Sequence, residues 1–393
     1  SSAASDVYKR QMNDMKGKQG LVCMGLLLVL SSCSCHTGKQ ITASGLQRKD
    51  FQTEVNGQHT DLFTLSNKQG MEVCITNYGA RVVSILVPDR NGKREDVVCG
   101  FSTITEYMEQ RQNFGSTVGR YIGRILNARF TLDGVEYKLV PNNGKSGHIS
   151  HGGNPGFADR IWKVEQADTH RVRLSYLSPD GENGFPGNLK VTLVYSLGED
   201  DNALDLTYEA TTDAPTVLNL SHHSFFNISG NFTKSVEDQQ LWVDADRFTP
   251  YDDKKCVTGE YLPVAGTPLD FRMPHTIGEC IDADHPQLKV VNGYDHTWEL
   301  NTKGDDTRPA AWVYDPASGR KMEIFTTEPG MQIYTGNGLK GKMTGKGGIA
   351  YPFRSAVCFE TMHFQDSPNQ PGFPSTVLRP GEVFRSHTVY KFE

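Results

Sequence analysis

Histidines and a glutamate that could exchange protons are concentrated in a few short segments, where they stand between glycines and aromatic residues. Four of these segments are residues 119–125, 148–153, 219–227 and 357–364, and a fifth is 293–296. Imidazole and carboxyl groups are the side chains most often used for general acid–base catalysis. We therefore take these segments as the candidates for a chemical site.

Strand geometry limits which of these side chains can face one cavity. Neighbours in a strand point to opposite faces, so His222 and His223 are not expected to line the same pocket. His148 and His151 are likewise separated if their segment is extended. Glu360 points away from its apolar neighbours, either to solvent or into a polar pocket. Charged residues are mostly exposed, which by itself favours solvent for Glu360.

The chain around these segments is dominated by short runs in which apolar and polar residues alternate, as in half-buried strands. The predicted strands are residues 62–65, 71–75, 81–87, 129–132, 135–139, 171–177, 189–197, 203–210, 311–314, 322–326 and 388–392. Asp133-Gly134 predicts a type I′ hairpin turn, because both positions tolerate positive φ. Helical periodicity is weak outside residues 104–110. The pattern predicts an all-β domain, a sandwich or a barrel, over residues 49–393.

The composition of the chain indicates which kind of ligand or partner it can bind. The 393 residues carry a formal charge of −6, with 37% hydrophobic and 22% charged residues. A mildly acidic chain without a basic cluster is not suited to nucleic acid. A neutral small molecule fits this balance better.

The N-terminus resembles an export signal. Residues 1–33 are interpreted as a non-native leader of about eleven residues followed by a signal with two lysines and the apolar run 21–30. This run is too short for a permanent membrane span. The sequence Leu30-Ser31-Ser32-Cys33 resembles the bacterial lipobox, in which the cysteine carries the lipid. We therefore expect attachment at Cys33, a tether over residues 34–48, and an exported protein anchored in the bacterial envelope, in the periplasm or at the cell surface. An ordinary signal peptide with an incidental cysteine is the alternative.

The eight cysteines are scattered, with no CxxC pair. Buried free thiols are the simplest interpretation, and whether any pair is bridged stays open. A zinc site built from His151, His223 and His363 is disfavoured, because their spacings match no compact ligand motif.

The body of the chain, from about Leu62 to the C-terminus, resembles the aldose 1-epimerase (galactose mutarotase) family. Each matching piece is weak alone, but their number, order and spacing make the resemblance strong. The matching pieces are residues 77–81, 114–120, 151–157, 178–189, 223–227, 294–296, 327–337, 373–375 and 378–382. The resemblance implies a galactose-mutarotase-like β-sandwich (a supersandwich) with an open sugar cleft.

The resemblance also implies a reaction and roles. To change anomer, a free hexose such as D-glucose or D-galactose must open its ring, which needs a base at the C1 hydroxyl and an acid at the ring oxygen O5. By the family pattern, Glu360 would be the base, His223 the acid, and His151 would support the proton transfer at O5. The residues expected to bind the sugar are Arg124, Asp295 and Gln332. No metal or organic cofactor is needed, and a monomer is expected.

Three positions depart from the family pattern. Gly123 and His222 stand where asparagine is frequent, and Met362 stands where glutamine is frequent. These departures affect the expected sugar preference rather than the reaction. Two rival functions remain: a non-catalytic carbohydrate-binding lipoprotein, and a glycoside hydrolase that would use Asp295 and Glu360 as its two carboxylates.

Overall fold

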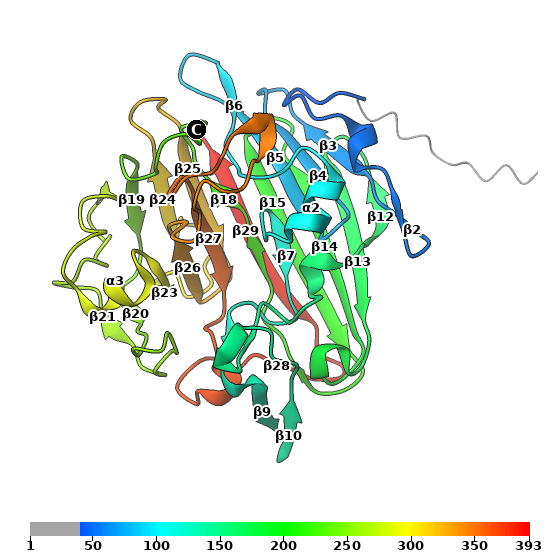
Figure 1. The fold of residues 1–393 in the computed structure, drawn as a ribbon, viewed down its shortest axis with the longest axis vertical. Coiled ribbons are helices and arrows are strands. Elements are labelled where there is room, and N and C mark those ends of the chain that lie inside the picture. The colour runs from blue at the N-terminus through cyan, green and yellow to red at the C-terminus, as the bar shows by residue number, and fades with distance from the viewer. Residues whose placement is uncertain (1–39) are drawn as a thin grey trace, which may run out of the picture. The chain divides into compact units, whose positions relative to one another are not determined.

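The largest element of the fold is a nine-stranded antiparallel sheet (Figure 1). It belongs to a computed structural model that describes residues 40–393. In spatial order its strands are β12 (Lys163–Ala167), β13 (Arg171–Ser178), β14 (Leu189–Leu197), β15 (Ala203–Thr212), β29 (Phe384–Phe392), β25 (Lys321–Thr326), β24 (Ala311–Tyr314), β19 (Gln240–Val243) and β22 (His275–Thr276). Buried and less buried residues alternate along β14 and β15, as expected for a sheet with one face on the core.

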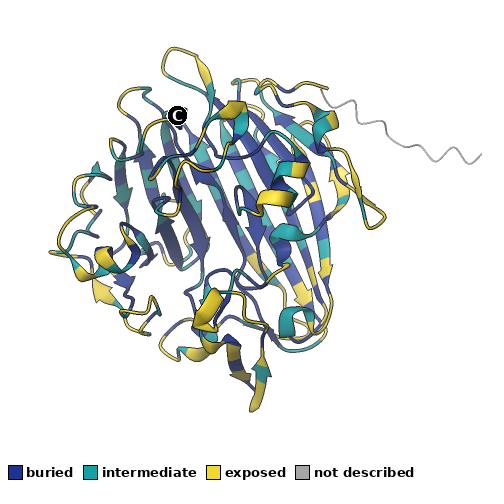
Figure 2. Ribbon diagram, viewed as in Figure 1, coloured by how far each residue is buried: buried dark blue, intermediate teal, exposed yellow. Residues whose placement is uncertain are grey.

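Two smaller antiparallel sheets face this large one. The six-stranded sheet has the order β18 (Phe225–Phe226), β27 (Val357–Met362), β26 (Gly330–Tyr334), β23 (Asp295–Glu299), β20 (Arg247–Thr249) and β21 (Leu262–Pro263). The four-stranded sheet contains β3 (Leu62–Ser66), β4 (Glu72–Thr76), β5 (Arg81–Pro88) and β6 (Arg94–Asp96). One apolar cluster joins all three sheets, with Leu193, Val73 and Phe359 among its members. The result is the predicted all-β sandwich, and Figure 2 shows its strands mostly buried and its loops exposed.

Strand pairs and short helices complete the described fold. The pairs are β1 (Glu54–Val55) with β2 (Gln58–His59), β7 (Ser116–Val118) with β17 (Ser221–His223), β8 (Arg124–Ile125) with β11 (Ile149–Ser150), β9 (Arg129–Leu132) with β10 (Val135–Lys138), and β16 (Thr216–Val217) with β28 (Val377–Leu378). The α-helices within residues 40–393 are α2 (Ile104–Gln110) and α3 (Pro286–Val291). The 3-10 turns are η1 (Arg48–Phe51), η2 (Leu126–Ala128), η3 (Gly144–Ser146), η4 (Phe157–Asp159), η5 (Glu182–Gly184), η6 (Lys346–Gly348) and η7 (Ser367–Asn369).

Local sequence signals explain the elements that were predicted. The predicted helix coincides with α2, where Thr103 and Glu106 form a capping box. Asp133 and Gly134 have φ values of 52° and 80°, as the predicted hairpin turn between β9 and β10 requires. Helix α3 was not predicted, because six residues carry little periodicity.

The last part of the expected tether packs against the domain. Leu46 is only 5% exposed, and the Glu72 carboxylate accepts hydrogen bonds from the Ala43 and Ser44 amides. Residues 40–48 are therefore ordered against the sheet, so the packed domain begins before residue 49. The signal peptide, the lipid site at Cys33 and the rest of the tether lie outside the described residues.

Within the described range, no helix has both the length and the apolar character that crossing a bilayer requires. The cysteines of this range, Cys74, Cys99, Cys256, Cys280 and Cys358, are free thiols, and three of them are buried. Burial as free thiols agrees with the simplest interpretation of their scattered spacing.

His387 on β29 lies between two carboxylates and predicts a pH-dependent stability. Its Nδ1 lies 2.6 Å from Asp306 Oδ2 and its Nε2 lies 2.6 Å from Asp205 Oδ2. Hydrogen bonding to Asp205 in particular raises the His387 pKa from 6.5 to about 9. The stabilisation is therefore complete below pH 6.5 and is lost as the pH rises through 9. We expect His387→Gln to lower the melting temperature at pH 7 by about 1–3 °C.

Above pH 9 the melting curves of the variant and the wild type should converge. Circular dichroism melts of both proteins at pH 6, 7, 9 and 10 measure this difference. A difference that is constant across these pH values would show that His387 does not carry the charge assigned to it.

Candidate active site

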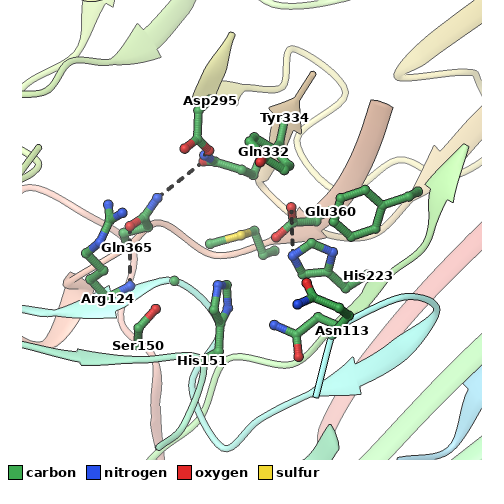
Figure 3. A pocket seen from close by; sticks show the side chains of 14 residues that line it. Asn113, Arg124, Ser150, His151, His223, Asp295, Gln332, Tyr334, Glu360 and Gln365 are labelled. Carbon is green, nitrogen blue, oxygen red and sulfur yellow. Dashed lines mark hydrogen bonds and ion pairs between the residues drawn. The ribbon is translucent and has the colours of Figure 1, made fainter. Parts of the chain in front are cut away.

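A cavity of about 250 Å³ opens beside the six-stranded sheet (Figure 3). All six residues that the sequence assigned to catalysis or sugar binding line it: Arg124, His151, His223, Asp295, Gln332 and Glu360. Its other lining residues are Gln112, Asn113, Gly123, Ser150, Phe225, Tyr334, Met362 and Gln365. A small cavity lined mainly by polar side chains suits a small hydroxylated ligand.

One wall of the cavity is formed by alternate residues of strand β27. Along β27, Val357 and Phe359 belong to the sandwich core, whereas Glu360 and Met362 line the cavity. Glu360 stands directly across from Gln332 on β26, with which β27 is paired. Glu360 is 4% exposed, so the simple expectation that it faces solvent is wrong. The reason is that β27 lies inside the sheet between β18 and β26 and is buried on both faces.

The facing wall comes from separate parts of the chain. His223 ends β17, which pairs with β7, and its ring stacks on Phe225 with 5.0 Å between ring centroids. His222 points the other way, where its Nε2 lies 2.6 Å from Ser224 Oγ. The predicted separation of the two adjacent histidines is therefore confirmed.

A tight turn after β11 presents His151. His151, Gly152 and Gly153 all have positive φ values, and a Cβ atom on Gly152 would come within 2.0 Å of the Gly119 carbonyl oxygen. Glycine is therefore required at residue 152 for this turn. His148 lies outside the cavity lining, where its Nδ1 accepts a hydrogen bond from the Asn127 amide.

The central feature of the cavity is the approach of a buried imidazole to a buried carboxyl group. His223 Nε2 lies 3.5 Å from Glu360 Oε1. Burial raises the Glu360 pKa well above its ordinary value, and the negative charge of Asp295 adds to this effect. Burial lowers the pKa of His223 well below its ordinary value, and the neighbouring His151 makes a smaller contribution in the same direction. Both shifts disfavour charge, so the pair holds one proton over a wide pH range.

His151 is a second imidazole at the same place. Its ring centroid lies 5.6 Å from that of His223, and its buried Nδ1 has no hydrogen-bond partner within the described residues. Burial and the nearby Arg124 lower the pKa of His151 to about 4. His151 is therefore neutral at pH 7 and has an unsatisfied polar atom that a ligand oxygen could satisfy.

A hydrogen-bond network holds the polar groups at the far end of the cavity. Gln332 Nε2 donates to Asp295 Oδ1 at 2.7 Å, and Gln332 Oε1 accepts from Thr297 Oγ1. Burial raises the pKa of Asp295. The guanidinium of Arg124 donates to the Lys255 carbonyl at 3.2 Å. These contacts fix the directions of an acceptor, an amide and a multi-donor cation before any ligand binds.

Gln365 is a cavity residue that the sequence interpretation missed. Its side chain fills the space beside Gly123, where an added Cβ would lie 2.5 Å from Gln365 Cγ. Its Nε2 donates to the Tyr251 hydroxyl at 2.6 Å, and its Oε1 accepts from the Arg124 amide at 3.3 Å. Glycine at residue 123 thus leaves room for a glutamine from a distant segment. The one available signal was the position of Gln365 just after segment 357–364.

Two arginines in the segments that match the family pattern, Arg81 and Arg120, make structural contacts with backbone carbonyls. The Arg81 guanidinium donates to the carbonyls of Gln112, Phe114 and Ala158, which holds the loop after α2. Arg120 is 1% exposed and donates to backbone carbonyls of segment 178–187.

The three-histidine zinc interpretation finds no support in the geometry. His363 Nδ1 lies 2.7 Å from Glu328 Oε2, and His363 is absent from the cavity lining. Only His151 and His223 of the three line the cavity.

The fold and this cavity define a class of protein, a β-sandwich with a buried imidazole and a buried carboxyl group 3.5 Å apart in a polar cavity. The sequence profile described as aldose 1-epimerase matches residues 61–391. The chain is 39% identical to a galactose mutarotase from Sus scrofa over 84% of this chain and 93% of that protein. It is 36% identical to an aldose 1-epimerase from Escherichia coli (strain K12) over 86% of this chain and 96% of that protein.

A solved structure of a GalM/aldose epimerase homologue from C. elegans has the same fold. It superimposes with a TM-score of 0.78 at 31% identity, covering 85% of this chain and 99% of the other. The chain therefore belongs to the aldose 1-epimerase family of isomerases.

Proposed function

We propose that this protein interconverts the α and β anomers of a free hexose in the cavity, with Glu360 and His223 as the proton carriers. The observation that supports these roles is the 3.5 Å approach of His223 Nε2 to Glu360 Oε1 inside the polar cavity. Glu360 takes the proton of the C1 hydroxyl while His223 gives a proton to O5. The C1–O5 bond breaks and the C1 aldehyde forms. Rotation about C1–C2 followed by the reverse proton transfers closes the ring as the other anomer.

The reaction needs one proton on the pair, which is the number that the two pKa shifts favour. Burial by itself favours the neutral pair, with the proton on Glu360. A sugar hydroxyl that hydrogen bonds to the carboxylate stabilises the alternative, with the proton on His223. Ring opening moves the proton of the pair from His223 to Glu360, and ring closure moves it back, so each complete turnover returns the pair to its starting state.

The remaining polar residues position the ring. Asp295 accepts hydrogen bonds from sugar hydroxyls and Arg124 donates to them, while Gln332 orients the C1 end beside Glu360. His151 has a free Nδ1 and its ring centroid lies 5.6 Å from that of His223, so it can bond at or near O5. Met362 and Gly123 border the same cavity, so two of the three family departures can affect the sugar preference directly, whereas His222 lies outside the lining.

Polarimetry tests the activity against its rivals. Fresh α-D-glucose and α-D-galactose should reach their equilibrium rotation faster with the protein than in buffer. Equal rates with and without protein would favour a carbohydrate-binding function. Release of sugar from an aryl glycoside would favour a glycoside hydrolase. The same assay on xylose and arabinose compares the substrates.

The shared proton predicts an unusually wide pH optimum. The one-proton state is lost at low pH only below the lowered pKa of His223, and at high pH only above the raised pKa of Glu360. Unperturbed side chains would confine this state to pH 4.5–6.5. We therefore expect kcat/KM to stay level through pH 7, as measured by polarimetry in constant ionic strength. An alkaline limb that falls already near pH 6.5 would contradict the shared proton.

We also propose that the protein is exported, anchored through a lipid on Cys33, and monomeric. The support for the anchor is the sequence Leu30-Ser31-Ser32-Cys33 after a short apolar run. The monomeric state is tested directly by the mass of the protein in solution. Expression with labelled palmitate in a bacterial host should label the wild type and not Cys33→Ala, and light scattering gives the mass in solution. Equal labelling of both proteins would rule out the anchor at Cys33.

A further inference from the structure

Cys358 is a buried thiol beside the acid–base pair that the ring opening does not use. Its Sγ lies 3.6 Å from His223 Nδ1. Cys358 and Glu360 are two residues apart on β27, so they project from the same face of the strand. The imidazole of His223 thus has a thiol near one nitrogen and a carboxyl group near the other.

The three groups together have the composition of a zinc site. One ligand atom from each of His223, Cys358 and Glu360 can be chosen so that all lie within 4.8 Å of one another. Zn²⁺ prefers such sulfur, nitrogen and oxygen ligands at roughly 2.0–2.3 Å, which places tetrahedral ligands about 3.3–3.7 Å apart. The measured separations of 3.6 Å and 3.5 Å lie in this range, but they involve different ring nitrogens. A rotation of Cys358 or Glu360 is therefore needed to bring both onto one ion.

We propose that His223, Cys358 and Glu360 form a binding site for a thiophilic divalent cation such as Zn²⁺, which inhibits the enzyme. The thiolate and the carboxylate neutralise the two charges of the ion, and Asp295 adds negative charge to the same cavity. The fourth position faces the cavity, where water or a sugar hydroxyl can bind. Binding releases the thiol proton and the proton of the acid–base pair to solvent.

We expect inhibition because the ion and the sugar use the same atoms of His223 and Glu360. An ion on His223 and Glu360 occupies the lone pairs that must exchange protons with the sugar, so ion and substrate compete. The ion is an inhibitor and has no part in the turnover. The prediction of inhibition rests on the proposed function, in which His223 and Glu360 carry the protons. The prediction that the ion binds rests on the ligand geometry alone.

A second thiol provides a matched control. Cys256 Sγ lies 3.3 Å from His148 Nε2, both residues lie outside the cavity lining, and Cys256 is partly exposed. This pair offers two ligands without a third in reach among the described residues. Cys256→Ser therefore removes the thiol best placed for adventitious metal binding and leaves the proposed site intact.

The experiment uses Zn²⁺ and Co²⁺ with the full chain. Zn²⁺ should slow mutarotation in competition with galactose, and a chelator should restore the rate. Co²⁺ should give the near-ultraviolet charge-transfer band of a thiolate ligand. In Cys358→Ser, the inhibitory Zn²⁺ concentration should rise by at least about tenfold relative to that variant's own activity, and the cobalt band should disappear. Cys256→Ser should keep both properties.

Equal Zn²⁺ sensitivity of the wild type and Cys358→Ser would overturn the proposal, as would loss of the cobalt band in Cys256→Ser. Cys358→Ala, checked by circular dichroism, replaces the serine variant if the latter does not fold. A wild type that binds neither ion also overturns the proposal. That result does not contradict the proposed mutarotase activity, because the activity is tested separately, by the loss of turnover in Glu360→Gln without added metal.

Discussion

Glu360→Gln should reduce kcat by about 10²–10⁴-fold while the protein keeps its fold. Glutamine has nearly the same shape as glutamate and can still hydrogen bond in the buried position across from Gln332. It cannot accept and return a proton, so the C1 hydroxyl loses its base. KM should change much less than kcat, because Arg124 and Asp295 still bind the ring. Polarimetry on α-D-galactose at several concentrations separates the two constants.

The matched control is Glu328→Gln. Glu328 is also buried, at 2% exposure, but it pairs with His363 outside the cavity. This variant removes a buried carboxylate without touching the sugar, so it should lose stability and keep its turnover. If Glu360→Gln instead keeps more than about a tenth of the wild-type rate, general base catalysis by this residue is excluded.

The sequence was most informative about strands with one exposed face. β14, β15 and β13 were visible because alternation of apolar and polar residues records which side faces the core. The strands that build the cavity are buried on both faces, so they show no such alternation. β26 and β27 are examples, and local pattern does not distinguish them from other apolar runs.

The pairing of strands far apart in the sequence determines which side chains line the cavity together. The alternation rule separated His222 from His223, but it could not bring His223 of β17 to Glu360 of β27. That approach depends on long-range pairing, since residues 223 and 360 are 137 positions apart in the sequence. The resemblance to the family supplied this pairing. Gln365 was missed because its role depends on space left by Gly123, which no local pattern records.

His223→Asn should abolish turnover to a similar extent, for the complementary reason. Asparagine keeps a polar group near Glu360 but cannot deliver a proton to O5, so the C1–O5 bond would have to break with an unprotonated alkoxide as the leaving group. General acid catalysis of this kind contributes about 10²–10⁴-fold. We expect kcat to fall by this factor at every pH where the wild type is active, as measured by polarimetry with substrate in excess of KM.

The neighbouring histidine provides the control, because strand alternation turns its side chain into the sandwich core. His222 has its Nε2 2.6 Å from Ser224 Oγ, its Nδ1 3.4 Å from the Tyr195 hydroxyl, and no part in the cavity lining. His222→Asn introduces the residue that the family frequently has there, so its effect should fall on stability while turnover persists. A His222→Asn variant as inactive as His223→Asn would mean that both substitutions act through folding, and the imidazole at residue 223 would lose its assignment as the acid.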